Sequence, residues 1–156
     1  MSKVEKHMLE IGKKLPDLSL EDENNEMIRL HDHTGIPMVI YFYPKDDTPG
    51  CTAEACSFRD SYEDFMELGA VVYGISADSP ASHKRFKEKH RLNFSLLTDR
   101  KKQAEKAFKV PRNLFGLLPG RVTFIVDREG KIAHHFNSAL NPQKHIDESL
   151  KALKKL

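Results

Sequence analysis

Two uninterrupted apolar runs, each followed by a helix-start pattern, constrain the fold of this chain most. The runs "PMVIYFYP" (37–44) and "AVVYGISAD" (70–78) are rich in β-branched and aromatic residues. They lack the alternation of apolar and polar residues that a strand with one solvent-exposed face shows, so they predict strands buried on both faces. Thr48-Pro49 and Ser79-Pro80 follow, each pairing a capping residue with proline at the first helical position. A buried strand leading into a helix, twice over, predicts an α/β domain with a central sheet covered by helices.

The remaining segments extend this alternation. The segment "PDLSLEDENNEMIRL" predicts two short strands joined at residues 22–25, where Asp and Asn favour a turn. Further along, we expect a short strand in "FSLLTD", a short helix in "RKKQAEKAFKV" and an irregular connection in "PRNLFGLLPG". A β-hairpin turning at 128–130 is expected in "RVTFIVDREGKIAHHF", followed by a closing amphipathic helix in "NPQKHIDESLKALKKL". The 156 residues contain no repeat, low-complexity tract or linker, which predicts a single domain over 1–156.

The stretch from residue 48 to residue 69 predicts one helix. Thr48 suits its N-cap and Gly69 its C-terminal stop. An inward face is predicted from four apolar residues at helical spacing, namely Phe58, Tyr62, Phe65 and Met66.

Composition excludes several classes of function. The net charge is +2, and lysines and arginines are scattered along the chain, so a nucleic-acid surface is not expected. No run of about 18 apolar residues is present, which argues against a membrane span. The charged start "MSKVEKHMLE" lacks the apolar region of a secretory signal, and we therefore expect a cytoplasmic protein. The eight glycines are dispersed, so no glycine-rich phosphate loop is predicted.

The chain has two cysteines, Cys51 and Cys56, in one short segment. Two are too few for a disulfide framework, and in a reducing cytosol such a pair binds metal, is redox-active or is incidental. Cys51 falls in the first turn of the predicted helix, where free N–H groups and the helix dipole favour a thiolate. Because the thiolate is the nucleophile, Cys51 is expected to be reactive, at an exposed helix start.

Cys56 lies five residues further along the same predicted helix. Their Cα atoms would be roughly 8–9 Å apart in an intact helix, whereas a disulfide normally needs about 7 Å or less. We therefore hypothesise that the two cysteines bond only if the first helical turns unwind. Cys56 as an ordinary small core residue is the alternative.

A zinc site would need further cysteines or histidines at close spacing. The histidine pairs at 31 and 33 and at 134 and 135 are the candidates, but neither adjoins the cysteines in sequence. We interpret these histidines as surface residues and expect no metal.

The pattern Pro44-x-x-x-Thr48-x-x-Cys51, inside "FYPKDDTPGCTAEAC" and together with "GRVTFIVDREGKI", resembles the peroxiredoxins. The similarity is to the peroxiredoxin Q or bacterioferritin comigratory protein subfamily and runs from "GKKLPDLSL" to "PQKHIDESLKALKKL". It implies a thioredoxin-like fold, with a central mixed sheet flanked by helices and an added N-terminal β-hairpin. It also implies reduction of hydroperoxides to water or alcohols without a bound cofactor. Members are monomers or dimers, and we expect a monomer.

The resemblance also implies roles for five residues. Cys51 takes the place of the peroxidatic cysteine, which becomes a sulfenic acid. Cys56 matches the resolving cysteine, which forms an intrachain disulfide that a thioredoxin-type donor reduces. Thr48 matches the threonine that contacts peroxide and thiolate, Pro44 the residue that shields the thiolate, and Arg121 the arginine that stabilises it.

Each assignment has a plainer structural alternative. Thr48 would serve as a helix cap, Pro44 as a strand terminator and Arg121 as a surface residue, with Arg112 and Arg59 as other candidate arginines. The chain also lacks tryptophan, which many relatives carry upstream of the arginine. The loop in "VPRNLFGLLPGRVTF" is therefore expected to differ in shape, with the chemistry retained.

Three other functions compete with a peroxidase. A thiol–disulfide oxidoreductase would share the fold, but its cysteines usually stand as C-x-x-C, which is absent here. A redox-sensing or holdase-like binding module would use Cys51 as a signal only. A structural α/β domain would keep both thiols inert.

Overall fold

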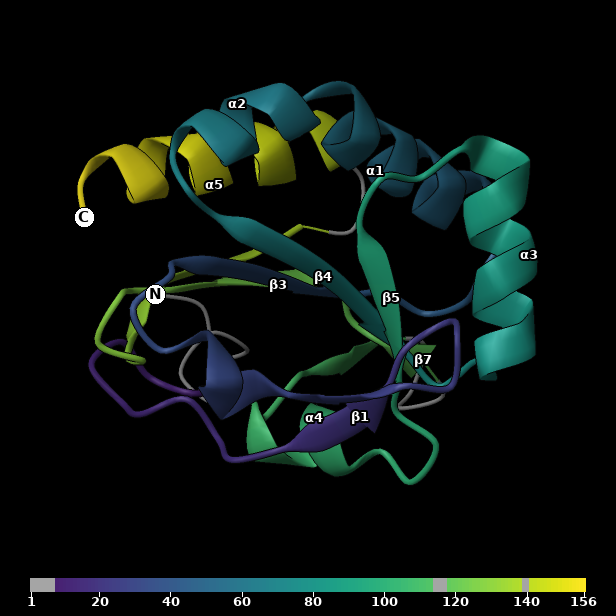
Figure 1. The fold of residues 1–156 in the computed structure, drawn as a ribbon, viewed down its shortest axis with the longest axis horizontal. Helices are drawn as coiled ribbons and strands as arrows, with labels where there is room; N and C mark the ends of the chain where they lie inside the picture. The colour runs from purple at the N-terminus through teal and green to yellow at the C-terminus, as the bar shows by residue number, and fades with distance from the viewer. Residues whose placement is uncertain (1–7, 114–117, 139–140) are drawn as a thin grey trace.

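The computed structural model describes residues 8–113, 118–138 and 141–156. A seven-stranded mixed sheet crosses the molecule in the order β2-β1-β5-β4-β3-β8-β9 (Figure 1). Its centre is three parallel strands, namely β3 (Met38–Phe42), β4 (Val71–Ser76) and β5 (Ser95–Thr98). The antiparallel strands β8 (Val122–Val126) and β9 (Ile132–Asn137) extend it on one side. The predicted N-terminal hairpin, β1 (Ser19–Glu21) and β2 (Met27–Arg29), extends it on the other. The mixed sheet and the hairpin are therefore confirmed.

Helices lie on both faces of the sheet, as predicted (Figure 1). One face is covered by α1 (Pro49–Asp60), α2 (Tyr62–Glu67), α3 (Pro80–His90) and α5 (Pro142–Lys154). The other face is covered by α4 (Gln103–Ala107) and the short 3-10 helix η2 (Leu30–His33). In β3, Val39 and Tyr41 pack toward α1, and Met38, Ile40 and Phe42 pack the opposite way. This two-sided burial is why the strand sequence has no polar alternation.

The single helix predicted over 48–69 is wrong in one respect, because the helix breaks at Ser61. Ser61 adopts φ −101° and ψ 10°, and α2 begins at the next residue. Phe58 and Phe65 are fully buried, but Met66 is 59% exposed instead of facing inward. Consecutive helical residues project about 100° apart, so Met66 lies on the flank of α2 beside Phe65 and faces solvent.

The predicted irregular connection at 111–120 is also partly wrong. Two-residue strands β6 (Arg112–Asn113) and β7 (Leu118–Pro119) pair antiparallel. Residues 114–117, which include the whole "LFG" stretch, lie outside the described residues. The Gly120 amide donates to the Pro111 carbonyl at 2.6 Å. A Cβ on Gly120 would stand 2.9 Å from that oxygen, so glycine permits this close approach.

The predicted start of α3 is confirmed, whereas the helix expected over 100–110 is shorter: α4 spans only Gln103–Ala107, because Lys102 and Lys109 adopt positive φ angles on either side of it. Ser79 caps α3 by accepting from the Ser82 amide, and Asn141 caps α5 by accepting from the Lys144 amide. Gly69, after α2, has a positive φ of 71°, as expected for a helix stop. None of the helices in the described part of the chain has the length and apolarity that crossing a bilayer requires.

Candidate active site

Cys51 lies where β3 delivers the chain to α1, at the carboxyl ends of the parallel strands. Ligand sites of open α/β sheets lie at this edge. The predicted exposed position is wrong, because Cys51 is only 1% exposed. Cys51, Ala55 and Phe58 stand at helical spacing on the inner face of α1 and join the same core cluster. The sulfur therefore sits at a helix start with its side chain directed into apolar surroundings.

Thr48 occupies the N-cap position of α1, but its side chain does not cap the helix. Its hydroxyl donates to the Lys45 carbonyl at 2.9 Å, while its own carbonyl accepts the first helical bond, from Thr52, at 2.8 Å. The capping role expected for the hydroxyl is therefore wrong. The hydrogen bond to Lys45 instead closes the short turn that carries Pro44 into α1.

Arg121 reaches the same place from the far end of the sequence. It directly precedes β8, whose Val122 pairs with Phe42 at the end of β3. Its guanidinium lies against Gly50, so closely that a Cβ at Gly50 would overlap it. Glycine in the first turn of α1 therefore allows the cation to approach the helix start beside Cys51. The Arg121 side chain is only 15% exposed.

The two other candidate arginines are engaged elsewhere. Arg59 binds Asp60 at 2.9 Å and the His90 carbonyl at 2.6 Å. Arg112 forms an ion pair with Glu105 at 2.8 Å. Of the three arginines considered, Arg121 is the one that lies at the first turn of α1.

Glu54 is a site residue that the sequence reasoning missed. It stands one turn after Cys51 and is fully buried. Its carboxylate oxygens lie 3.7 Å from Arg121 Nη1 and 3.5 Å from His145 Nε2. Among the described residues, neither oxygen has a hydrogen-bond partner. The spacing Cys51-x-x-Glu54, which places both side chains on one helix face, was the available signal.

Burial raises the pKa of Glu54 to about 8, against the opposing effect of Arg121. Glu54 is therefore mostly a neutral acid at pH 7. Burial also lowers the pKa of His145, whose Nε2 donates to the Ser138 carbonyl and whose Nδ1 lies 2.8 Å from the Thr123 hydroxyl. With Glu54 and His145 both neutral, Arg121 is the charged member of this group of three.

Cys56 lies on the same continuous helix, half-buried, and both cysteines are free thiols. The candidate histidines have other partners: His31 contacts the Leu15 carbonyl, His33 the Tyr73 hydroxyl and His134 the Glu148 carboxylate.

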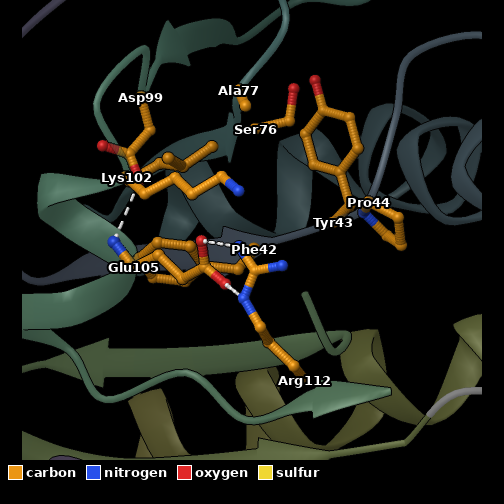
Figure 2. Close-up of a pocket in the computed structure, with 10 residues that line it drawn as sticks. Phe42, Tyr43, Pro44, Ser76, Ala77, Asp99, Lys102, Glu105 and Arg112 are labelled. Carbon is orange, nitrogen blue, oxygen red and sulfur yellow. Dashed lines mark hydrogen bonds and ion pairs between the residues drawn. The ribbon is translucent and has the colours of Figure 1, made fainter. Parts of the chain in front are cut away.

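A pocket of about 180 Å³ opens beside Pro44. Figure 2 shows Pro44 on one side of the pocket and the Glu105–Arg112 ion pair on another. The pocket is lined by the ends of β3 and β4, by α4 and by β6, through Phe42, Tyr43, Pro44, Ile75, Ser76, Ala77, Asp99, Lys102, Glu105 and Arg112. Its apolar residues offer contacts to the organic part of a small molecule whose reactive group reaches the Pro44 loop.

Comparisons with known proteins identify the family. The model of the AhpC/TSA family matches residues 11–135. The chloroplastic peroxiredoxin Q of Populus jackii is 48% identical over 145 residues, covering 93% of this chain and 68% of that protein. That of Sedum lineare is 48% identical over 145 residues, with 93% and 78% covered.

Solved structures give the same result. The peroxidoxin BcpB of Mycobacterium tuberculosis superposes with a TM-score of 0.87 at 34% identity, over 95% of this chain and 98% of that one. A peroxiredoxin Q structure of Xanthomonas campestris gives 0.82 at 34% identity, over 90% and 96%. The chain therefore belongs to the AhpC/TSA family, in its peroxiredoxin Q or bacterioferritin comigratory protein branch, and is a thiol-dependent peroxidase with a thioredoxin-like fold.

Proposed function

We propose that this peroxidase reduces hydrogen peroxide and organic hydroperoxides through a two-cysteine cycle in which Cys51 reacts with the peroxide. The observation that carries the proposal is Cys51 in the first turn of α1, with the Arg121 guanidinium packed on Gly50 one residue before it. The positive charge and the free N–H groups of the helix start both stabilise a thiolate.

In the first step, the Cys51 thiolate attacks one peroxide oxygen and the O–O bond breaks. The sulfur loses two electrons and becomes a sulfenic acid, and the leaving oxygen takes a proton to form water or an alcohol. Negative charge develops on that oxygen, so a fixed cation beside it lowers the barrier. Arg121 suits this role because a guanidinium stays charged at any working pH, and neutral Glu54 leaves that charge uncompensated.

Thr48 and Pro44 complete the proposed site. Thr48 donates its hydroxyl hydrogen to Lys45, so the lone pairs of that oxygen remain to accept a hydrogen bond from the peroxide. Pro44 lines the pocket of Figure 2, and its proposed role is to shield the Cys51 sulfur from water. The organic substituent of a larger hydroperoxide occupies that pocket.

In the second step, the Cys56 thiol attacks the sulfenic sulfur, an S–S bond forms and water leaves. Because both cysteines stand on one intact helix, the first turns of α1 must unwind before the sulfurs meet. A thioredoxin-type dithiol then reduces the bond by exchange and is itself oxidised.

We further propose that the protein acts as a monomeric single domain, residues 1–156, in the cytoplasm. Both cysteines of the cycle belong to one helix of one chain, so no second chain is needed to supply a thiol. The cytoplasm provides the dithiol donors that the cycle consumes. Sedimentation of the reduced and oxidised protein tests the monomer.

Stopped-flow consumption of hydrogen peroxide and cumene hydroperoxide, with a thioredoxin regenerating system, tests the cycle. We expect Cys51→Ser to abolish turnover and Cys56→Ser to complete one fast turnover and stop as the sulfenic acid. Continued cycling of Cys56→Ser would instead show that an external thiol resolves the intermediate. An oxidoreductase acting on protein disulfides would turn over without peroxide, and a sensor or an inert domain would not turn over rapidly.

A further inference from the structure

Two consecutive aspartates tie the loop between β3 and α1 to α3. Asp46 binds Ser82 and His83, and Asp47 binds Lys89 and His90. We call these two aspartates and their four partners on α3 the loop clamp. The mechanism described above uses none of its side chains.

The Asp46 half of the clamp is a buried network in which both carboxylate oxygens of Asp46 have hydrogen-bond partners. Asp46 Oδ2 lies 2.7 Å from His83 Nδ1, with the two side chains 3% and 0% exposed. The same oxygen accepts from the Ser82 hydroxyl at 2.9 Å, and Oδ1 accepts from the Tyr43 hydroxyl at 2.5 Å. His83 Nε2 lies 3.1 Å from the Leu97 carbonyl, which can only accept, so this nitrogen carries a hydrogen.

The backbone of Asp46 is held as well. Its amide donates to Asp78 Oδ2 at 2.9 Å, and the Ser76 hydroxyl donates to the same oxygen at 2.7 Å. One potential ligand atom from each of Asp46, Asp78 and His83 lies within 4.8 Å of the other two, a spacing that could hold a cation. Because the ligand atoms of Asp46 and His83 already have hydrogen-bond partners, the cluster acts as an anchor for the loop.

The Asp47 half is exposed and holds a strained backbone. Asp47 adopts φ 59°, a left-handed conformation that residues other than glycine adopt uncommonly. Its carboxylate oxygens lie 2.8 Å from Lys89 Nζ and 3.2 Å from His90 Nε2. Hydrogen bonds from Lys89 and His90 hold the pKa of Asp47 below its usual range. These contacts to α3 oppose relaxation of the loop.

The clamp lies between the two loop residues of the active site. Pro44 precedes Asp46 by two positions, and Thr48 follows Asp47 directly. Since the Thr48 hydroxyl bonds to Lys45 inside the same loop, fixing Asp46 and Asp47 fixes Pro44 and Thr48 together. We propose that Asp46 and Asp47, held by α3, are positioning residues that place Pro44 and Thr48 for reaction of Cys51 with peroxide. The inference rests on the proposed role of Cys51.

The clamp also defines which part of the chain rearranges during the cycle. The side-chain contacts of Asp46 and Asp47 are to α3 and to Tyr43, and the Asp46 amide binds Asp78 in the connection between β4 and α3; none of these partners lies on α1. Unwinding of α1 therefore leaves them intact and begins after Asp47. When α1 refolds, the loop that carries Pro44 and Thr48 is still in its original position.

A single-turnover experiment in the Cys56→Ser background tests the proposal with two reagents. Reaction of Cys51 with hydrogen peroxide needs the geometry of Pro44 and Thr48, whereas alkylation by iodoacetamide needs only an accessible thiolate. We expect His83→Phe, which fills the space but removes the donor to Asp46, to lower the peroxide rate constant by roughly 10- to 100-fold. The alkylation rate should not fall with it, since displacing Pro44 can only uncover the sulfur, and His83→Gln, which restores an N–H donor, should recover part of the loss of the peroxide rate constant.

Asp47→Gly provides a variant at an exposed position with no risk to the core. Glycine adopts a positive φ without strain, so only the bonds to Lys89 and His90 are lost, and the peroxide rate constant should again fall more than the alkylation rate. Leu92→Ala is the stability control, because it opens a cavity in the same core beyond the end of α3 and should lower the melting temperature without changing the rate constant. Lys84→Ala, exposed on α3, should change neither.

Peroxide and alkylation rates that fall in parallel, or clamp variants that keep the wild-type peroxide rate while folded, would overturn the inference. Cys51→Ser separates this failure from failure of the proposed function. If Cys51→Ser still consumes peroxide, the assignment of Cys51 is wrong. If it is inactive while Asp47→Gly and His83→Phe react normally, only the clamp is wrong.

Discussion

Glu54 shows how one buried residue sets the charge of the site. A carboxylate beside Arg121 would ordinarily pair with the guanidinium and cancel its charge. Full burial and the lack of hydrogen bonds among the described residues instead keep Glu54 protonated to about pH 8. The cation therefore stays available to an anionic sulfur and to the developing oxyanion.

The raised pKa of Glu54 predicts a specific loss of stability with rising pH. The folded protein holds this proton up to about pH 8, whereas the unfolded chain releases it near the ordinary value of 4.5. The contribution of Glu54 to stability is thus full below pH 4.5 and is lost as the pH rises through about 8. Urea unfolding of Glu54→Gln, whose amide stays neutral, should show a flatter decline over this range than wild type.

Glu63→Gln is the control for this measurement, since Glu63 is exposed on α2 and its change should leave the pH dependence as it is in wild type. Parallel curves for wild type and Glu54→Gln would show that Glu54 is already ionised in the folded protein at neutral pH.

At the scale of the element, α1 has two requirements that conflict. Its first turn must be intact to stabilise the Cys51 thiolate, yet that turn must open for Cys56 to reach the sulfenic acid. The break at Ser61 makes α1 a helix of 12 residues, so the first turns are a large part of it. Short helices depend on tertiary contacts for most of their stability. A modest change of helix propensity can therefore shift the equilibrium between the intact and the unwound first turns of α1.

Thr52, between the cysteines, is the position at which to test this balance. Alanine has a higher helix propensity than threonine by up to about 0.7 kcal/mol, and glycine a lower one. We expect Thr52→Ala to slow disulfide formation roughly two- to threefold, and Thr52→Gly to accelerate it. Mass spectrometry at increasing peroxide should show more sulfinic acid in Thr52→Ala and less in Thr52→Gly. Changes of the same sign in both variants would rule out helix unwinding as the limiting step.

At the scale of the whole molecule, the site is assembled by strand pairing. Pro44, Thr48 and Cys51 follow β3, whereas Arg121 precedes β8, and the antiparallel pairing of β3 with β8 brings the two segments together. The pocket of Figure 2 likewise joins the ends of β3 and β4 to α4 and β6. We therefore expect substrate size to be sensed in part by β4, α4 and β6, which supply none of the residues proposed for the sulfur chemistry.

Filling this pocket should change substrate preference. Ala77 lines it at the end of β4, and Ala77→Phe should lower kcat/KM for cumene hydroperoxide several-fold while leaving that for hydrogen peroxide nearly unchanged. Ala81→Phe is the matched control, because Ala81 is exposed at the start of α3 and does not line the pocket. Equal losses for both peroxides in Ala77→Phe would place the organic substituent elsewhere.

Local sequence was sufficient to predict the strands of the seven-stranded sheet with its N-terminal hairpin, the cap of α3 and the presence of both cysteines on one helix. These features depend on burial pattern, cap chemistry and neighbours within a few residues. Prediction failed at Thr48, whose hydroxyl could bond either to an amide of the first helical turn or to a carbonyl of the preceding loop. In the structure it bonds to the Lys45 carbonyl. Prediction also failed at Ser61, because nothing as strong as proline or glycine marks the break.

Only the tertiary structure decided which side chains surround Cys51. Glu54 reads in sequence as an ordinary helical glutamate, and its pairing with Arg121 and His145 requires β8 and α5 to be in place. Asp46 and Asp47 read as turn residues, and their binding to His83 and Lys89 requires α3 to pack beside the loop. The physical reason is the same in both cases: a charge, a proton or a hydrogen bond is set by the groups within a few ångströms, and here those groups come from segments distant in sequence.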